Sequence, residues 1–110
     1  MIRYIVIRTQ FEALHKWPDS PEDLYIAFLR YPHRHIFHVT MKWEVNGDNR
    51  EIEFITMKNK VEAYIQAKWH TKDLGSMSCE QIAGVLAREF DSIFVSVFED
   101  NENGAEVYNG

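Results

Sequence analysis

The chain has 110 residues and a formal net charge of −5, and 45% of its residues are hydrophobic, which predicts one domain over residues 1–110 with a single core. The excess of acid argues against non-specific nucleic-acid binding, which depends on Lys and Arg, and no apolar run reaches the ~18 residues of a membrane span. The N-terminus carries no signal-peptide pattern and the one cysteine, Cys79, excludes an internal disulfide, so we expect a protein of the reducing cytoplasm.

The first half of the chain is rich in β-type sequence. Residues 2–13 alternate loosely and contain many β-branched and aromatic side chains, which predicts a strand. Residues 15–32 contain all three prolines and are expected to form a long excursion with one helical turn after Ser20-Pro21. Residues 33–45, "HRHIFHVTMKWEV", predict a second strand. The "NGD" that follows is a hairpin signal, and "REIEFIT" (residues 50–56) is expected to return as a third extended segment.

The second half changes to helical spacing. Residues 57–69 place Met57, Val61, Tyr64, Ile65 and Lys68 near one stripe. A second helix is expected after the capping residue Ser78, with Ile82, Val85, Leu86 and Phe90 on its buried face. "SIFVSVFED" and "GAEVYN" predict two final strands. The resulting order, ββααββ, predicts an α+β fold in which two helices pack on one face of an antiparallel sheet.

Histidines are concentrated at the start of the second predicted strand. Side chains alternate across a strand, so His33 and His35 share one face and His38 points to the other. His15, at the end of the first strand, lies beside this pair if the two strands are antiparallel. Three histidine nitrogens with an open fourth position form the usual ligand set of catalytic zinc. The alternative is that all three are polar strand residues that bind no metal.

Four segments, taken together, resemble one enzyme family. "FEALH" followed by "HRHIFHV" looks like the F-x-A-x-H and H-G-H-N-Y-x-V signatures of the 6-pyruvoyl- and 6-carboxy-tetrahydropterin synthases. "EIEFITMKNKV" is similar to the hydrophobic-x-D-F-x-x-L-K stretch of that family. "SMSCEQIA" matches its N-P-T-S-E-x-[IL]-A helix start at Ser78, Glu80 and Ala83, and "VSVFED" resembles its V-x-V-x-E-T strand, which ends in glutamate.

The resemblance implies the tunnelling fold, or T-fold, in which small antiparallel sheets join around a threefold axis. It implies Zn²⁺ on His15, His33 and His35, and a pterin-type heterocycle held by Glu99. Ser78 and Glu80 are further ligand-binding candidates, although Glu80 also stands where a helix favours a carboxylate. The family's sites lie between subunits, so we expect a trimer or hexamer, and strand edges left open in a small domain point the same way.

The proton-transfer residues of the family are poorly matched. Its cysteine before H-G-H has no counterpart in "LYIAFLRYP", and the nearest acids are Glu22 and Asp23. His70 lies close to the sequence position at which the family has an Asp-His pair, but no aspartate directly precedes it. The nearest acid is Asp73, which follows His70. His70 is therefore either a surface residue or, with Asp73 or Glu22, a proton shuttle. Cys79 is expected to be a small packing residue.

Two functional hypotheses follow. The first is a zinc-dependent tetrahydropterin-synthase-like enzyme, a carbon–oxygen lyase acting on dihydroneopterin triphosphate or a related pterin. The second is a non-catalytic T-fold module that binds a pterin, purine or nucleotide-like ligand, because a missing general base typically costs two to four orders of magnitude in rate. Biopterin, folate and deazaguanine (queuosine) pathways are all compatible with the sequence.

Overall fold

The computed structural model describes residues 1–110 and contains four strands, two α-helices and one short 3-10 helix. Their order along the chain is strand, strand, helix, helix, strand, strand, as the sequence predicts. The elements are β1 (Arg3–His15), η1 (Ala27–Arg30), β2 (His33–Val45), α1 (Phe54–Lys68), α2 (Cys79–Glu89), β3 (Phe94–Glu99) and β4 (Asn103–Tyr108).

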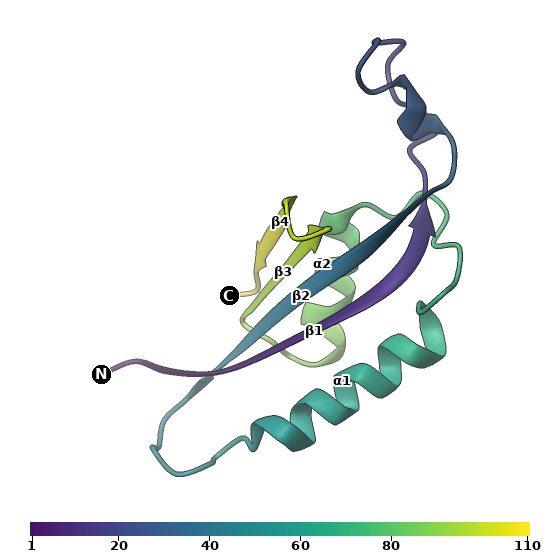
Figure 1. Cartoon of the computed structure of the whole chain (residues 1–110). Coiled ribbons are helices and arrows are strands. Elements are labelled where there is room, and N and C mark those ends of the chain that lie inside the picture. The colour runs from purple at the N-terminus through teal and green to yellow at the C-terminus, as the bar shows by residue number, and fades with distance from the viewer.

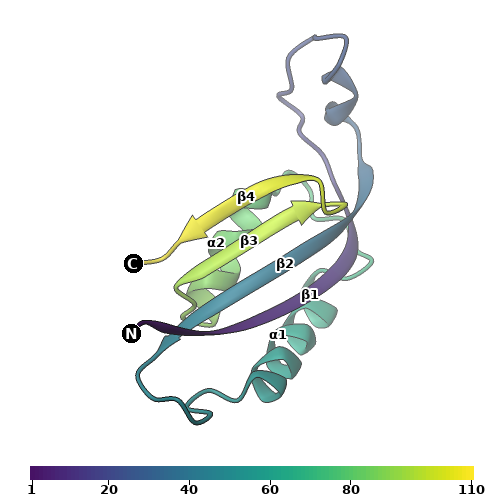
Figure 2. The same cartoon turned by 60° about the vertical axis from the view of Figure 1, so that its left-hand side comes forward.

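The strands form one antiparallel sheet in the order β1-β2-β3-β4. Both α-helices lie on the same face of this sheet, with α1 along β1 and α2 across β3 and β4 (Figures 1 and 2). The opposite face is covered by no other element of the chain. The predicted α+β architecture, with two helices on one face, is therefore confirmed. No helix combines the length and apolar character that a membrane span requires.

The core lies between the sheet and the helices. The predicted helix stripes supply it with Val61 and Ile65 from α1 and with Ile82 and Leu86 from α2, all of them buried. Lys68, which we placed near the first stripe, is instead exposed. The strands add alternate residues, which is the pattern expected when only one face of a sheet is covered. These strand residues are Ile7, Phe11, Ala13, Phe37, Val39, Met41, Trp43, Val95 and Val97.

The third extended segment, expected at residues 50–56, is wrong: no strand forms there. β1 pairs with β2 along the whole length of β2, and β3 occupies its other edge from Phe37 to Lys42. A hairpin return after β2 would therefore compete with β3. Instead the chain turns away, and Glu51 accepts hydrogen bonds from the N–H groups of Asn46 and Gly47 at 3.1 and 3.0 Å.

The first α-helix begins one turn earlier than predicted. The sequence suggested a start at Met57, but α1 starts at Phe54. The carboxylate of Glu53 accepts hydrogen bonds from the N–H groups of Ile55 (2.7 Å) and Thr56 (3.1 Å), which caps the first turn. Residues 54–56 are aromatic and β-branched, a composition that favours a strand. The Glu53 cap gives them a helical conformation instead.

Residues 16–32 form an arm that projects beyond the end of β1 and β2 (Figures 1 and 2). The predicted helical turn is found, but at η1 rather than directly after Ser20-Pro21. The buried Ser20 hydroxyl donates to the carbonyl of Ile26 at 2.8 Å instead of capping a helix. The arm is thus held by its own hydrogen bonds at the end of the sheet where the histidines lie.

Candidate metal centre

Three histidines meet at the end of the sheet from which the arm projects. His15, the last residue of β1, pairs directly with His33, the first residue of β2. His35 pairs with Ala13, one step further along the two strands. The ring centroids are 4.5 Å apart for His15 and His33, 5.3 Å for His15 and His35, and 4.9 Å for His33 and His35. All three rings lie on the face that carries the helices.

Each of these histidines uses its Nδ1 atom to contact an oxygen acceptor. A carbonyl or carboxylate oxygen accepts only, so Nδ1 must carry the proton in each contact. This leaves Nε2 of all three rings with a free lone pair in the neutral imidazole. The distances are 2.8 Å from His15 to the Met77 carbonyl, 2.9 Å from His33 to the Tyr31 carbonyl and 2.7 Å from His35 to the Asp100 carboxylate.

The carboxylate of Glu99 lies against two of the free nitrogens. Its two oxygens are 3.1 Å from Nε2 of His15 and 3.1 Å from Nε2 of His35. These are ion-pair distances, but both nitrogens are fully buried and neither makes a hydrogen bond of acceptable geometry. Buried polar atoms without a partner are rare in folded proteins, and such an arrangement suits a cation shared by the surrounding donors.

The residues present therefore fit a divalent metal ion. One nitrogen from each histidine lies within 4.8 Å of the other two. Zinc binds histidine nitrogen at about 2.0–2.1 Å, which places the ligand atoms of a tetrahedral site about 3.3 Å apart. Small rotations of the rings would close this gap. The group formed by His15, His33 and His35 is able to bind a metal ion.

A cavity of about 500 Å³ opens beside this group, a volume in the usual range for small-molecule sites. Its lining includes His15, His33 and Glu99 from the strands, and Ser78 and Glu80 from the start of α2. The structure thus brings together the predicted metal ligands and the three predicted ligand-binding residues, Ser78, Glu80 and Glu99.

The electrostatics of the cavity keep Glu99 ionised. The nearby His15 lowers the pKa of Glu99, and this outweighs the opposing effect of partial burial. Burial lowers the pKa of His15, but the Glu99 carboxylate and the Met77 carbonyl together raise it above its ordinary value. Each partner stabilises the charged form of the other.

Cys79 also lines the cavity, with its thiol sulfur 3.6 Å from Oε1 of Glu99. Burial, reinforced by the Glu99 carboxylate, raises the pKa of this thiol to about 12. Because the thiolate is the nucleophilic form of cysteine, the side chain is inert at neutral pH. This agrees with the expectation that Cys79 packs rather than reacts.

The three predicted proton-transfer residues do not line this cavity within the chain. His70 lies beside β1, where its Nδ1 accepts a hydrogen bond of 3.4 Å from the Glu12 N–H. Asp73 accepts from the N–H of Gly75 at 2.8 Å. Glu22 is on the arm, almost fully exposed, and pairs loosely with Arg30 at 3.7 Å. The structure does not bring these residues together with the histidine group.

Sequence reasoning missed the residues that orient the histidines. One of them is Asp100, which directly follows β3; an acid next to Glu99 at a strand end is a usable sequence signal. The carbonyls of Met77 and Tyr31 carry no sequence signal, since any residue supplies a carbonyl. His38 pairs with Gln10 and Phe98 and lies on the uncovered face, as alternation predicts.

Among the comparisons with known proteins, the one with solved structures found matches in fold. No protein-family model matches the chain, and no curated protein matches it in sequence. The matching solved structures include two that align over the full chain. An uncharacterized protein from Wolinella succinogenes has a TM-score of 0.73 at 12% identity, covering 100% of this chain and 99% of that one. The 6-pyruvoyl tetrahydropterin synthase of Caenorhabditis elegans has a TM-score of 0.69 at 12% identity, covering 100% and 97%.

Proposed function

We propose that this chain, which has the T-fold of a 6-pyruvoyl tetrahydropterin synthase, is a zinc-dependent enzyme of that type. Its reaction would be that of a carbon–oxygen lyase acting on dihydroneopterin triphosphate or a related pterin. The observation that carries the proposal is the histidine group: three rings on one face, each with its Nδ1 against an oxygen acceptor, which leaves the Nε2 lone pair of the neutral ring available to a metal ion. Such outer contacts are typical of metal-binding histidines.

His15, His33 and His35 would hold the zinc ion. When bound, zinc supplies a Lewis acid that acidifies the hydroxyl groups of a ligand beside it. The adjoining cavity is large enough for a small-molecule ligand, and the start of α2 contributes to its lining. The arm residue Trp17, which is half-exposed, offers an aromatic surface at the rim.

Glu99 would hold the heterocycle. An ionised carboxylate can accept two parallel N–H bonds from an amino-pyrimidinone edge, which is a geometrically specific contact. The lowered pKa of Glu99 keeps it in this form. Glu80, exposed in the first turn of α2, is positioned for a second polar contact, whereas the Ser78 hydroxyl already caps α2 by accepting from the Gln81 N–H at 3.1 Å.

Proton transfer would require a neighbouring subunit. His70, with Asp73 or Glu22 as acidic partner, stays our candidate shuttle, but none of the three lines the cavity of its own chain. A trimer or hexamer with sites between subunits would be needed to bring such groups to the histidines. We place this assembly in the cytoplasm, where the single buried thiol of Cys79 would stay reduced.

The first test asks whether the three histidines bind a metal ion or are polar strand residues that bind none. We expect purified protein to bind about one zinc per chain, and we expect His33→Ala to abolish this binding. His38→Ala is the matched control, since His38 lies on the same strand but faces the other way. Equal metal content in all three proteins, measured by elemental analysis, would show that the histidine group is not a metal site.

The second test addresses the reaction. The zinc-loaded protein is incubated with dihydroneopterin triphosphate and the pterins are analysed by mass spectrometry. A new tetrahydropterin product, lost in Glu99→Gln, is the expected result. Tight binding that depends on Glu99 with the ligand recovered unchanged would contradict catalysis and indicate a binding module instead.

A further inference from the structure

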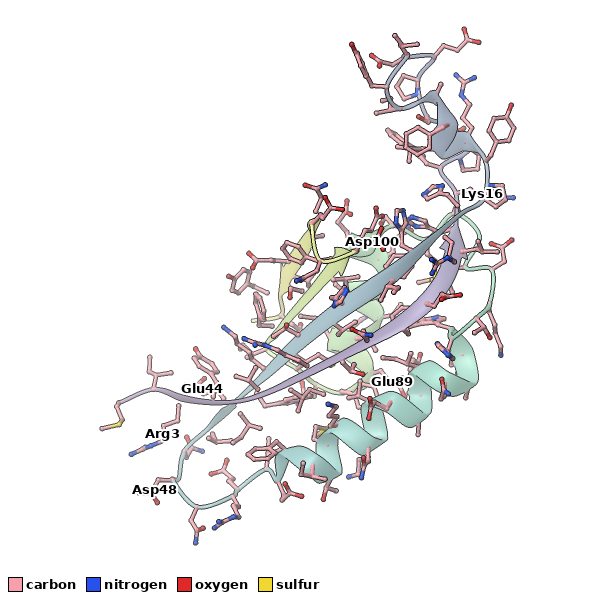
Figure 3. The ribbon with its side chains drawn as sticks, in the orientation of Figure 1. Arg3, Lys16, Glu44, Asp48, Glu89 and Asp100 are labelled. Carbon is pink, nitrogen blue, oxygen red and sulfur yellow. The ribbon has the colours of Figure 1, made fainter.

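The turn after β3 brings a second acidic residue to the histidine group. Asp100 lies at the same end of the molecule as Lys16, the residue that follows His15 (Figure 3). Its backbone N–H donates to the Ile36 carbonyl at 2.7 Å, which extends the pairing of β3 with β2 beyond the last strand pair, Phe37 and Glu99. Asp100 is thereby fixed beside the "HRHIF" segment of β2.

The side chain of Asp100 contacts this segment with both oxygens. Oδ2 accepts from the Nδ1–H of His35 at 2.7 Å, and Oδ1 accepts from the backbone N–H of Ile36 at 3.0 Å. One oxygen therefore orients the ring, and the other anchors the carboxylate to the backbone next to it. The His35 ring cannot turn about its own axis without losing the shorter of these bonds.

The backbone of Asp100 is also specialised. Its φ is 52°, in the left-handed region, and the next residue, Asn101, has a φ of 58°. Asp and Asn adopt this region more readily than other residues with a side chain. The left-handed backbone of this turn therefore suits an aspartate, and from this position its carboxylate contacts both His35 and Ile36.

We propose that Asp100 is a positioning residue that holds His35 with its Nε2 directed at the metal. This inference rests on the proposed metal site and adds a residue outside the three ligands. A carboxylate on the far nitrogen of a metal-binding histidine fixes the proton on that nitrogen and increases the basicity of the other.

The two-acceptor geometry predicts the effect of a nearly isosteric change. In Asp100→Asn one oxygen becomes an NH₂ group, which donates and cannot accept. One of the two N–H donors, from His35 or from Ile36, then loses its partner. Loss of such an outer contact typically weakens metal binding about 10- to 100-fold.

The experiment measures zinc affinity by competition with a chelator in wild type, Asp100→Asn and Asp91→Asn. Asp91 is the matched control: it is exposed, has a φ of 51° and makes no side-chain hydrogen bond. We expect affinity to fall about 10- to 100-fold in Asp100→Asn and to stay unchanged in Asp91→Asn. Asp100→Glu, which keeps two acceptors on a longer side chain, should retain more affinity than Asp100→Asn.

A spectroscopic measurement excludes a purely structural role. In zinc-loaded wild type, NMR of labelled histidine should show an exchange-protected Nδ1–H signal for His35. This signal should be lost in Asp100→Ala, which removes both acceptor oxygens, while those of His15 and His33 persist. Wild-type zinc affinity in Asp100→Asn together with an unchanged His35 signal in Asp100→Ala would overturn the role of Asp100. If wild type binds no zinc, or if His33→Ala binds zinc as tightly as wild type does, the proposed metal site itself is wrong, and this result is distinct from a failure of the role of Asp100.

Discussion

At the scale of single residues, side-chain direction separates the histidines. His33 and His35 face the helices together with His15, and His38, which follows them by five and three residues, lies on the uncovered face. The period of two along a strand gives this result without any tertiary information. A cluster of histidines in sequence is therefore a poor guide to a cluster in space unless its spacing is considered.

Gly104 shows how closely the chain packs beside the cavity. A Cβ added there would lie 2.0 Å from the Val97 carbonyl oxygen and 2.6 Å from Cα of Phe98, both of them backbone atoms that cannot move aside cheaply. Gly104→Ala is therefore expected to lower the free energy of unfolding by about 1–3 kcal/mol. Thermal or urea denaturation measures this change.

Gly84 is the matched control for this prediction. It lies inside α2, and an added Cβ would approach only the flexible Arg88 side chain, at 3.3 Å from Nη1. Gly84→Ala should raise the free energy of unfolding by about 0.5–1 kcal/mol, because alanine is the better helix former. Equal effects of the two substitutions would contradict the close approach of β4 to β3.

At the scale of elements, the hydrophobic period predicts that a helix forms, but capping residues determine where it begins. α2 begins where the sequence predicts, because Ser78 and Gln81 form a complete capping box. α1 begins earlier than predicted, because Glu53 is an unusual capping residue and the first turn looks β-like. Local side-chain bonds thus set helix ends more firmly than the hydrophobic pattern does.

The Glu53 cap predicts a pH-dependent stability. The N–H group of Ile55 is the main cause of the lowered pKa of this carboxyl, whose ordinary value is 4.5. A carboxyl with a lowered pKa stabilises the fold above its unfolded value, and this contribution is lost as the pH falls. The stability difference between wild type and Glu53→Gln should therefore be largest at neutral pH and shrink below about pH 4.5. The same difference at about pH 3 and about pH 7 would show that the ionised carboxylate is not the cap.

At the scale of the whole molecule, the sheet has open edges. The outer edge of β4 is unpaired, and β1 is paired on its outer side only near Glu12 and Leu14, by residues 71–74. The arm adds apolar side chains that the chain does not cover, with Leu24 91% and Tyr25 80% exposed. Open edges and exposed apolar groups of this kind are normally covered by another chain.

These surfaces predict an oligomer. We expect light scattering to give three or six times the mass of one chain, because antiparallel sheets that join edge to edge satisfy the free N–H and C=O groups of β1 and β4. The measurement should be repeated over a range of concentrations to detect dissociation. A monodisperse monomer throughout would contradict the shared-site arrangement, while leaving the metal site of the single chain testable by itself.

The sequence alone determined the strand and helix order, the buried helix faces and the grouping of His15 with His33 and His35. These follow from periodicity and antiparallel pairing, which depend on short stretches of chain. Only the tertiary structure decided that residues 50–56 form no strand, since the edges of β2 are occupied by strands distant in sequence. It also decided the orientation of the histidines, because the partner of His35 is 65 residues away and that of His15 is 62 residues away. Contacts of this range depend on the completed sheet.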